Sequence, residues 1–371
     1  MPLTHKERFL MAINHEEPDR VPIDIWFTPE AEKQLLEYLG RDKVKAKLIK
    51  EFSASHGTSG SGIIPHLLDF DFFMTWHGPA CGYYAKEDAE YYDEWGVKWR
   101  WVDAGQGTRY TEIAEHRLAD MKEPTDFNMP DYKDEARYEN SKEMIAKFGK
   151  EYAIMGAMTC TFFEIAWYLR GMEKLMMDMA ANKDWAHAYF DKIITWAIDA
   201  ASKLTELGVD VIWIGDDFGS QNRMLISPQM FREFIKPRYV RLFEILRKIN
   251  PNIKIALHCD GYFEPIIPDL IEIGVQIINP VQPRSMDPAE IKKKYGKNLV
   301  LWQTLDNQYT FPFGSVQDVI DETLLRLKTC ASGGGLIIGP SHNVQSHVSV
   351  EKIMAFIDTV NKYGTYPIKI D

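Results

Sequence analysis

The sequence predicts an α/β fold, namely a (β/α)8 TIM barrel with an insertion in its N-terminal third. Three observations lead to this prediction. Short apolar runs alternate with helical patterns, polar residues follow directly after several of these runs, and no Gly-x-Gly-x-x-Gly phosphate motif follows any of them. With 371 residues and a mass of 42.9 kDa, residues 1–371 are expected to form one such barrel domain.

Seven apolar runs have the composition of strands that are buried on both faces of a parallel sheet. They comprise residues 21–26, 152–158, 209–215, 253–258, 275–279, 299–303 and 336–339. The eighth strand is expected within residues 67–73 or near the carboxyl end.

Helix starts between these runs are marked by side chains that cap the first turn, often with a proline after them. These signals are Thr4 with Glu7, Ser227-Pro228, Asp287-Pro288, and Ser315 with Asp318. The helical pattern over residues 228–250 contains Pro237, which predicts a kink or a break there because proline removes a backbone donor.

Two segments depart from the alternation of strands and helices. Residues 82–137 are aromatic, charged and irregular, so we expect an insertion packed over the barrel, with a short hairpin at residues 93–101. Residues 53–62 are rich in Ser and Gly, which predicts a mobile loop that serves as a linker or as a lid.

The charge and composition exclude several classes of partner. A net charge of -11 and a pI near 5.5 argue against nucleic acid and against an anionic membrane, and leave a small molecule or a protein. Neither a long apolar segment nor a signal peptide is present, so we expect a cytoplasmic protein, and a homodimer stays open. No disulfide framework is expected from four widely separated cysteines, Cys81, Cys160, Cys259 and Cys330.

Three residues at predicted strand ends form a candidate metal site. His258 and Asp260 face the same way if the chain stays extended, while Cys259 faces away, and His342 follows the last predicted strand. Because the strand ends of a barrel converge on one pocket, these three catalytic candidates would supply two imidazoles and one carboxylate, a set that suits zinc or ferrous iron. Hydrogen bonding among them and a substrate, without a metal, is the alternative that the spacing alone favours.

Two adjacent carboxyl groups follow the strand predicted at residues 209–215. Adjacent residues on an extended chain face opposite ways, so Asp216 and Asp217 are not expected to share a proton. We expect Asp216 to face the site as a catalytic acid or as a binder of a cationic group. Asp217 would contact the substrate or cap the following turn.

Other residues at predicted strand ends are candidates for binding the substrate. They are Trp26, as part of an aromatic wall, and the amides Asn279, Gln282, Gln303 and Asn343. Cys259 is more simply interpreted as a small buried apolar residue than as a reactive thiol.

Several segments, taken as a set, match a known family. They include residues 17–22 (Glu-Pro-Asp-Arg-Val-Pro), 215–221 (Gly-Asp-Asp-Phe-Gly-Ser-Gln), 258–261 (His-Cys-Asp-Gly), 279–283 (Asn-Pro-Val-Gln-Pro) and 339–343 (Gly-Pro-Ser-His-Asn). In these segments the chain resembles the uroporphyrinogen decarboxylase superfamily. The resemblance implies a (β/α)8 barrel and either of two activities.

The two branches of this superfamily differ at positions that the sequence shows. True decarboxylases remove acetate carboxyls from uroporphyrinogen III without a cofactor and carry an Arg-rich segment for those carboxylates, whereas residues 27–32 here contain two glutamates and no arginine. Cobalamin-linked methyltransferases hold zinc with His-x-Cys after one strand and Cys after the last. The resemblance to them implies that His258 is a ligand and that Asp260 and His342 replace the two cysteines.

On this resemblance we expect a zinc-dependent methyltransferase. It would pass a methyl group from a small donor, a methoxylated aromatic or a methylamine, to cobalamin on a separate corrinoid protein. Imidazole and carboxylate in place of thiolates leave a harder metal, which suits an ether or amine leaving group. Uroporphyrinogen decarboxylase is the first alternative, and a non-catalytic tetrapyrrole-binding protein is the second.

Overall fold

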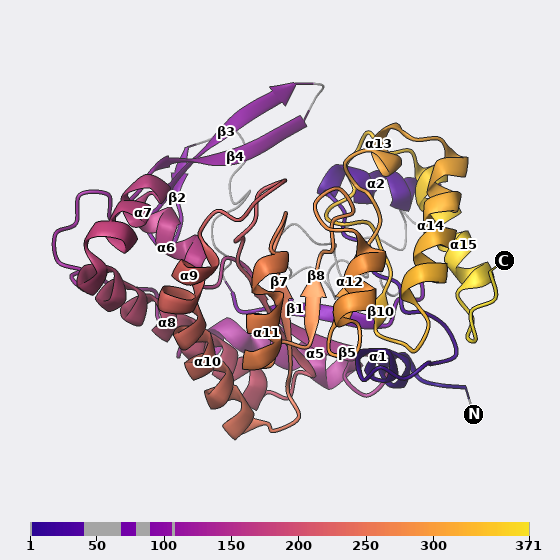
Figure 1. Ribbon diagram of the computed structural model, residues 1–371, viewed down its shortest axis with the longest axis horizontal. Helices are drawn as coiled ribbons and strands as arrows, with labels where there is room; N and C mark the ends of the chain where they lie inside the picture. The colour runs from indigo at the N-terminus through magenta and orange to yellow at the C-terminus, as the bar shows by residue number, and fades with distance from the viewer. Residues whose placement is uncertain (1, 41–67, 79–89, 106–107, 371) are drawn as a thin grey trace.

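The computed structural model describes residues 2–40, 68–78, 90–105 and 108–370, and seven of its strands form one parallel sheet (Figure 1). The strand order is β1-β5-β6-β7-β8-β9-β10. The strands are β1 (Phe72–Trp76), β5 (Ala153–Met158), β6 (Val211–Gly215), β7 (Lys254–His258), β8 (Ile277–Asn279), β9 (Val300–Trp302) and β10 (Leu336–Ile337).

The eighth position around the sheet is taken by the segment that follows Arg20. Ile23 bridges Ile338 in parallel, next to β10, and the backbone of Asp24 donates to Ile338 at 3.0 Å. On the other side of this segment, Nη1 of Arg20 lies 2.8 Å from Oδ2 of the buried Asp71, directly before β1. Together the eight positions confirm the predicted α/β barrel.

The predicted strands are confirmed in order, with shorter bounds. Within residues 21–26 a single isolated parallel bridge, at Ile23, takes the place of a continuous ladder, and the eighth strand, β1, begins near the end of the range 67–73 and runs on to Trp76. In the parallel register Gly215 pairs with His258, and His258 pairs with Asn279. This register brings the carboxyl ends of β6, β7 and β8 side by side.

Helices cover the outside of the sheet (Figure 1). They are α1 (His5–Ile13), α2 (Pro29–Tyr38), α5 (Glu139–Phe148), α6 (Phe163–Arg170), α7 (Met172–Ala181), α8 (Lys183–Glu206), α9 (Pro228–Met230), α10 (Lys236–Ile249), α11 (Ile267–Ile273), α12 (Pro288–Tyr295), α13 (Thr310–Phe313), α14 (Val316–Cys330) and α15 (Val350–Tyr363). Short 3₁₀ turns precede α5 and α11, at Glu135–Tyr138 and Glu264–Ile266.

The predicted helix starts are confirmed. Thr4 and Ser315 each accept from the third backbone N–H of the helix and complete capping boxes, and Ser227 and Asp287 cap α9 and α12. The predicted break near Pro237 is also confirmed, because a π-helical turn at Phe231–Ile235 separates α9 from α10.

A small antiparallel sheet lies within the range predicted as an insertion. Its order is β2-β3-β4, with β2 (Tyr91–Tyr92), β3 (Lys98–Gly105) and β4 (Thr108–Glu115). The β2–β3 turn confirms the predicted hairpin, and the longer β3–β4 hairpin is an addition to it. The rings of Trp95 and Trp196 of α8 meet edge to face at 5.6 Å, which fixes this sheet against the helices. The loop predicted at residues 53–62 lies outside the described residues.

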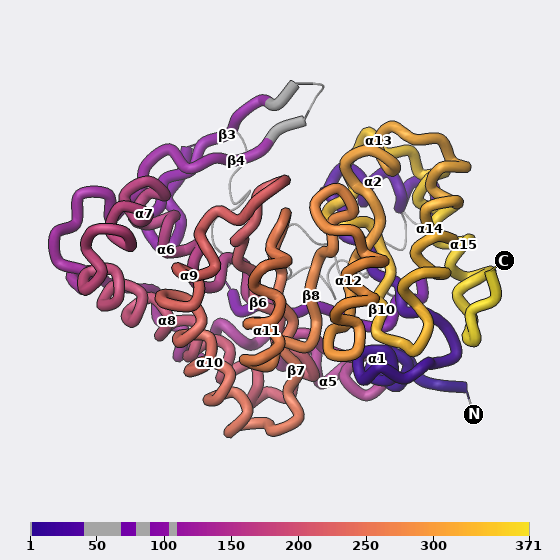
Figure 2. Tube along the Cα trace, viewed as in Figure 1, coloured from indigo at the N-terminus to yellow at the C-terminus, as the bar shows by residue number. Residues whose placement is uncertain are grey.

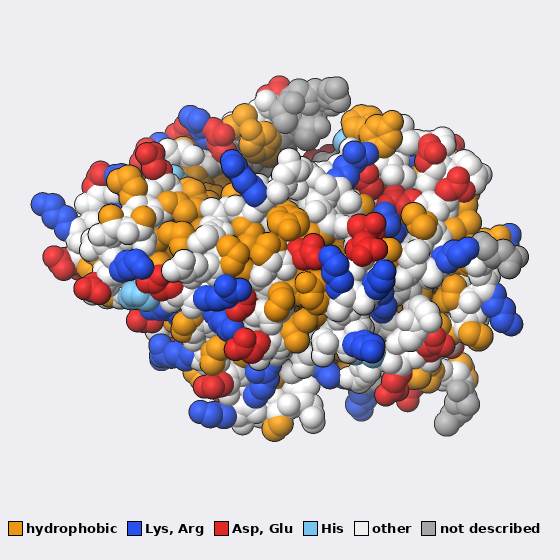
Figure 3. All heavy atoms as spheres, viewed as in Figure 1, with side chains coloured by type: hydrophobic (Ala, Val, Ile, Leu, Met, Phe, Trp, Pro, Cys, Tyr) orange, Lys and Arg blue, Asp and Glu red, His pale blue; other side chains and the backbone are white. Residues whose placement is uncertain are grey.

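The two ends of the chain meet on one side of the barrel. Figure 2 shows the N and C marks on the same side, and the segments that follow α1 and α15 meet where the backbone of Val21 donates to Gly364 at 2.9 Å. On the face shown in Figure 3, basic and acidic side chains are interspersed with hydrophobic ones. No helix in the described part of the chain has both the length and the apolar character that a membrane crossing needs.

The barrel interior is filled with large aromatic side chains. Along β6, Val211 and Trp213 belong to the inner cluster, whereas Ile212 and Ile214 belong to the outer core under the helices. The ring of Trp26 meets those of Trp213 and Trp302 edge to face, at 5.8 and 5.6 Å. These three indoles form a rigid layer inside the barrel.

Candidate metal centre

The candidate metal centre begins at the carboxyl end of β7. His258 is the last residue of that strand, and Asp260 projects to the same side two residues later. Cys259 faces the opposite way and is buried, where its Sγ accepts a hydrogen bond from the backbone of Phe218 at 3.2 Å. Both the predicted alternation and the interpretation of Cys259 as a buried apolar residue agree with this arrangement.

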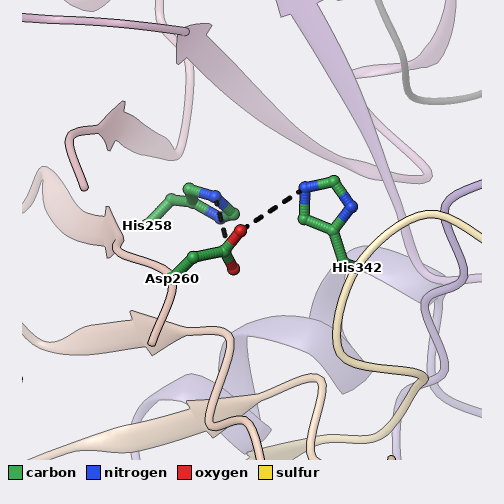
Figure 4. A group of neighbouring side chains, drawn as sticks. All are labelled: His258, Asp260 and His342. Carbon is green, nitrogen blue, oxygen red and sulfur yellow. Dashed lines mark ion pairs between the residues drawn. The ribbon is translucent and has the colours of Figure 1, made fainter. Parts of the chain in front are cut away.

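His342 completes a triad with His258 and Asp260 (Figure 4). One ligand atom from each residue lies within 4.8 Å of the other two. Asp260 stands between the imidazoles, with Oδ1 3.9 Å from Nε2 of His258 and Oδ2 3.7 Å from Nε2 of His342. The side chains of His258, Asp260 and His342 are 10%, 29% and 41% exposed, so His342 is the most accessible of the three.

The backbone at His342 is held in an uncommon conformation. Its φ of 123° is one that side-chain-bearing residues seldom adopt. The loop is fixed on both sides of this position, because Ser341 donates to the backbone of Leu305 at 2.8 Å and Val344 donates to Trp26 at 2.7 Å. The loop after β10 therefore presents the imidazole of His342 in one defined place.

Two amides stand behind His258. Nδ1 of His258 lies 2.8 Å from Oδ1 of Asn279, and Nδ2 of Asn279 donates to Oε1 of Gln303 at 2.9 Å. Asn279 and Gln303 are fully buried. The sequence predicted that they bind the substrate, but the structure places them behind an imidazole, with no exposed surface.

Asp260 is also held from behind. Nε2 of Gln282 donates to its Oδ1 at 3.0 Å, and Oε1 of Gln282 accepts from the backbone of Gly261 at 2.8 Å. The backbone N–H of Asp260 donates to Oδ1 of Asp217 at 2.7 Å. Burial, and after it the negative charge of Asp260, raise the pKa of the Asp217 carboxyl.

The structure reverses the prediction for the two adjacent aspartates. Asp217 turns toward Asp260, whereas Asp216 turns into the core, where its Oδ1 accepts from the backbone N–H groups of Phe162 and Glu164 at 3.1 and 2.9 Å. Its Oδ2 accepts from the hydroxyl of Tyr239. Asp216 therefore caps the start of α6, which is where the helix dipole stabilises a carboxylate.

The two remaining predicted residues border the triad. The ring of Trp26 lies 5.6 Å from that of His258 and 6.2 Å from that of His342, so the indole forms one wall beside both imidazoles. Asn343 follows His342 and is buried, and its backbone oxygen accepts from Asn307 at 2.8 Å. The side-chain oxygen of Asn343 has no hydrogen-bond partner among the described residues.

The triad fits a metal such as zinc in donor type and in spacing. Ligand atoms around tetrahedral zinc lie roughly 3.3 Å apart when the bonds are about 2.0–2.1 Å long. The carboxylate oxygens of Asp260 lie 3.7 and 3.9 Å from the imidazole nitrogens, so small side-chain rotations would close the shell. Because Nδ1 of His258 is engaged by Asn279, its Nε2 is the nitrogen that faces the other two residues.

Two further side chains support the site, and neither was predicted in this hydrogen-bonding role from the sequence. Asp24 is buried inside the barrel and accepts from Nε2 of Gln303 at 3.0 Å, and Trp213 donates to Oδ1 of Asn279 at 3.3 Å. An acidic residue in the apolar run at residues 21–26 was the available signal for Asp24, because a buried carboxyl needs partners.

Fold and site together define a class of protein, a (β/α)8 barrel with two histidines and one aspartate gathered at the carboxyl ends of its strands. Within that class, the chain belongs to the uroporphyrinogen decarboxylase (URO-D) family, whose model matches residues 95–363.

Two comparisons place the chain among proteins that are known. A methyltransferase from Methanosarcina mazei has a similar structure, with a TM-score of 0.67 and 20% identity over 97% of this chain and 99% of that chain, which shows the shared fold. Uroporphyrinogen decarboxylase from Synechocystis sp. is 22% identical over 219 residues. That match spans 58% of this chain and 60% of the curated relative.

Proposed function

We propose that this chain is an enzyme that transfers a methyl group from a small methylated donor to a corrinoid protein, with zinc held by His258, Asp260 and His342. The observation that carries the proposal is the convergence of these ligand atoms within 4.8 Å at the carboxyl ends of the strands. Family membership and the likeness to a methyltransferase support it.

The donor set favours one kind of chemistry. When bound, zinc would supply Lewis acidity to the heteroatom that carries the methyl group. Two neutral imidazoles and one carboxylate neutralise less of the zinc charge than two thiolates and an imidazole do, which leaves a more electrophilic metal. Such a metal suits activation of an ether oxygen or an amine nitrogen as the leaving group better than activation of a thiol. Among the three ligands only Asp260 supplies a negative charge.

The wall beside the triad suits the two donor classes that the sequence suggested. The small exposed part of the Trp26 indole would contact a methoxylated aromatic ring, or a methylammonium group through a cation–π interaction, bound at the triad. His342 is the most exposed of the three ligands, so a corrinoid partner would approach the triad from its side.

Carboxyl groups near the mouth disfavour uroporphyrinogen as a substrate. Asp217 and Asp260 lie in the site, and the first turn of α2 carries Glu30 and Glu32. Arg284, on the loop after β8, is already paired with Asp306 at 2.7 Å. An octa-anionic substrate would meet like charge at these positions. The match to the Synechocystis enzyme nevertheless makes decarboxylation the reaction to test beside methyl transfer.

The test uses the full chain, purified without chelators and supplied with zinc and a corrinoid protein reduced to Co(I). Methoxylated aromatics and methylamines form the donor panel, and the absorbance of the methylated corrinoid is the readout. We expect methylation with at least one donor, and its loss when His258 is replaced by Ala.

Parallel incubations distinguish the alternatives. Conversion of uroporphyrinogen III to coproporphyrinogen, without methylation of the corrinoid, would support the decarboxylase instead. Tight tetrapyrrole binding with neither reaction would support a non-catalytic binding protein. A His187→Ala variant serves as the matched control, because this histidine lies on α8, where its Nε2 is 3.9 Å from Glu233 and its ring is 4.7 Å from that of Phe234.

A further inference from the structure

A buried carboxyl group lies below the candidate metal centre, in the segment that completes the barrel. Asp24 is 6% exposed, and its Oδ2 accepts two hydrogen bonds, from Nε1 of Trp302 at 2.9 Å and from Nε2 of Gln303 at 3.0 Å. Burial raises the pKa of this carboxyl to about 7. Trp302, Trp26, Gln303 and the backbone of Ile25 oppose this rise as hydrogen-bond donors to the carboxyl group.

A chain of hydrogen bonds leads from Asp24 to the metal centre. Gln303 turns its NH2 group to Asp24, so its Oε1 faces Asn279 and accepts from Nδ2 at 2.9 Å. Asn279 thus turns its Oδ1 to His258, whose Nδ1 lies 2.8 Å away. An amide oxygen only accepts, so Nδ1 of His258 must be the donor.

Two indoles agree with this direction, since an indole N–H only donates, but only Trp213 contacts one of the amides. Nε1 of Trp302 donates to Oδ2 of Asp24, and Nε1 of Trp213 donates to Oδ1 of Asn279 at 3.3 Å. Reversing either amide would bring donor against donor. The bond from Trp213 is the longest in the network, so it is the weaker of the two constraints on Asn279.

We infer that Asp24 is a positioning residue of the site, which through Gln303 and Asn279 keeps the proton of the neutral His258 ring on Nδ1. The Nε2 lone pair is then directed toward Asp260 and His342, on the side where a ligand atom is needed. Zinc binding as a consequence rests on the proposed function, whereas the proton position does not.

The experiment reads the proton position in metal-free protein labelled with ¹⁵N in its histidine rings. The His258 signal is assigned by its loss in the His258→Gln variant, and the two ring nitrogens are compared at a pH where the ring is neutral. In a Trp213→Phe background, the hydrogen bonds that run from Asp24 through Gln303 are the remaining constraint on the orientation of the Asn279 amide. In that background we expect Nδ1 to stay protonated, and the preference to be lost on adding Asp24→Leu or Gln303→Met.

Two further variants separate this role from simple packing. Asp24→Asn should keep the preference, because Trp302 holds the new amide oxygen where Gln303 needs it. Trp302→Phe, which removes a bond to the same Asp24 oxygen but lies outside the chain to His258, should keep it as well. Loss of the preference in Trp302→Phe to the same extent as in Asp24→Leu would overturn the inference. Gln303→Met provides the same test should Asp24→Leu not fold.

Zinc titration with a chelating dye then separates this inference from the proposed function. The variants that lose the Nδ1 proton should bind zinc about 10- to 100-fold more weakly than Trp213→Phe alone. A shifted proton in a protein whose parent binds no zinc would leave the inference standing and remove the proposed function. Normal zinc binding, with the proton still on Nδ1 in both Asp24→Leu and Gln303→Met, would overturn the inference and leave the proposed function standing.

Discussion

Nε2 of His342 lies 3.7 Å from Oδ2 of Asp260, although β8 and β9 separate their strands in the sheet. In a flat sheet, with strands about 4.8 Å apart, three strand spacings would put the two residues roughly 14 Å from each other. The curvature of the barrel brings them together. The site therefore exists because the sheet closes into a barrel, which brings residues that are far apart in the sequence into contact.

The first prediction concerns the stoichiometry of zinc. Replacing His258, Asp260 or His342 by Ala removes one of three protein ligands, so each variant should retain well under one zinc per chain after dialysis, whereas wild type should retain close to one. Atomic absorption measures the metal. His187→Ala should bind as wild type does, and equal retention by all four variants would show that the metal lies elsewhere.

The second prediction concerns the closure of the barrel. Asp71 is fully buried and pairs with Nη1 of Arg8 and with Nη1 of Arg20, both at 2.8 Å. Without Asp71, Arg8 keeps Asp19 and Arg20 keeps Asp69 as partners, but each loses a buried charged hydrogen bond, so Asp71→Ala should lower the free energy of unfolding by about 1–3 kcal/mol. Denaturant titration measures this change.

An exposed aspartate gives the control for that measurement. Asp120 pairs with Lys174 at 2.8 Å on the surface, so Asp120→Ala should leave the denaturation midpoint almost unchanged. Similar midpoints for the Asp71 and Asp120 variants would contradict the role that we assign to the buried pair.

The third prediction concerns pH and the buried Asp216. Burial raises the pKa of this carboxyl from 3.8 to about 6. Between these values the unfolded chain loses the proton and the folded chain keeps it, so the free energy of unfolding falls as pH rises through this window. Above it the loss is complete, on the order of 3 kcal/mol.

Asp216→Asn removes this titration while keeping an oxygen that accepts from Phe162 and Glu164, and the Tyr239 hydroxyl can accept from the new amide. Wild type should therefore lose stability relative to the variant as pH rises from 3.8 to about 6. Urea titrations at several pH values measure the difference. A difference that stays constant over that range would refute the assignment.

The fourth prediction concerns the thiols. Cys160, Cys259 and Cys330 are buried, and burial raises the pKa of the Cys259 and Cys330 thiols. In a Cys81→Ser variant, a thiol reagent should therefore react slowly with the native protein and with three thiols after denaturation. Fast labelling of Cys259 in the native state would mean that it is accessible and reactive, contrary to its packing against Phe218.

The sequence was sufficient for the features that depend on local patterns. The strand at residues 253–258 and the break near Pro237 follow from composition and backbone chemistry alone, and the structure confirms both. The meeting of His258 and Asp260 follows from strand periodicity. Adding His342 required one further rule, that the strand ends of a barrel converge.

The roles of individual polar residues were harder to predict. Alternation places Asp216 and Asp217 on opposite sides, but which side faces the site depends on the exact end of β6 and on the position of α6. Asn279 ends β8 as predicted, and Gln303 directly follows β9, yet their side chains bond to His258 and to the buried Asp24. These assignments depend on tertiary neighbours that no local pattern reveals.

X-ray absorption spectroscopy at the zinc edge, on the full chain loaded with one equivalent of zinc, tests the metal centre most directly. We expect a shell of nitrogen and oxygen atoms at about 2.0–2.1 Å with imidazole scattering, and no sulfur at about 2.3 Å. That imidazole scattering should diminish in the His342→Ala variant. A zinc–sulfur shell, or a wild-type spectrum that does not change in that variant, would contradict a centre built from His258, Asp260 and His342.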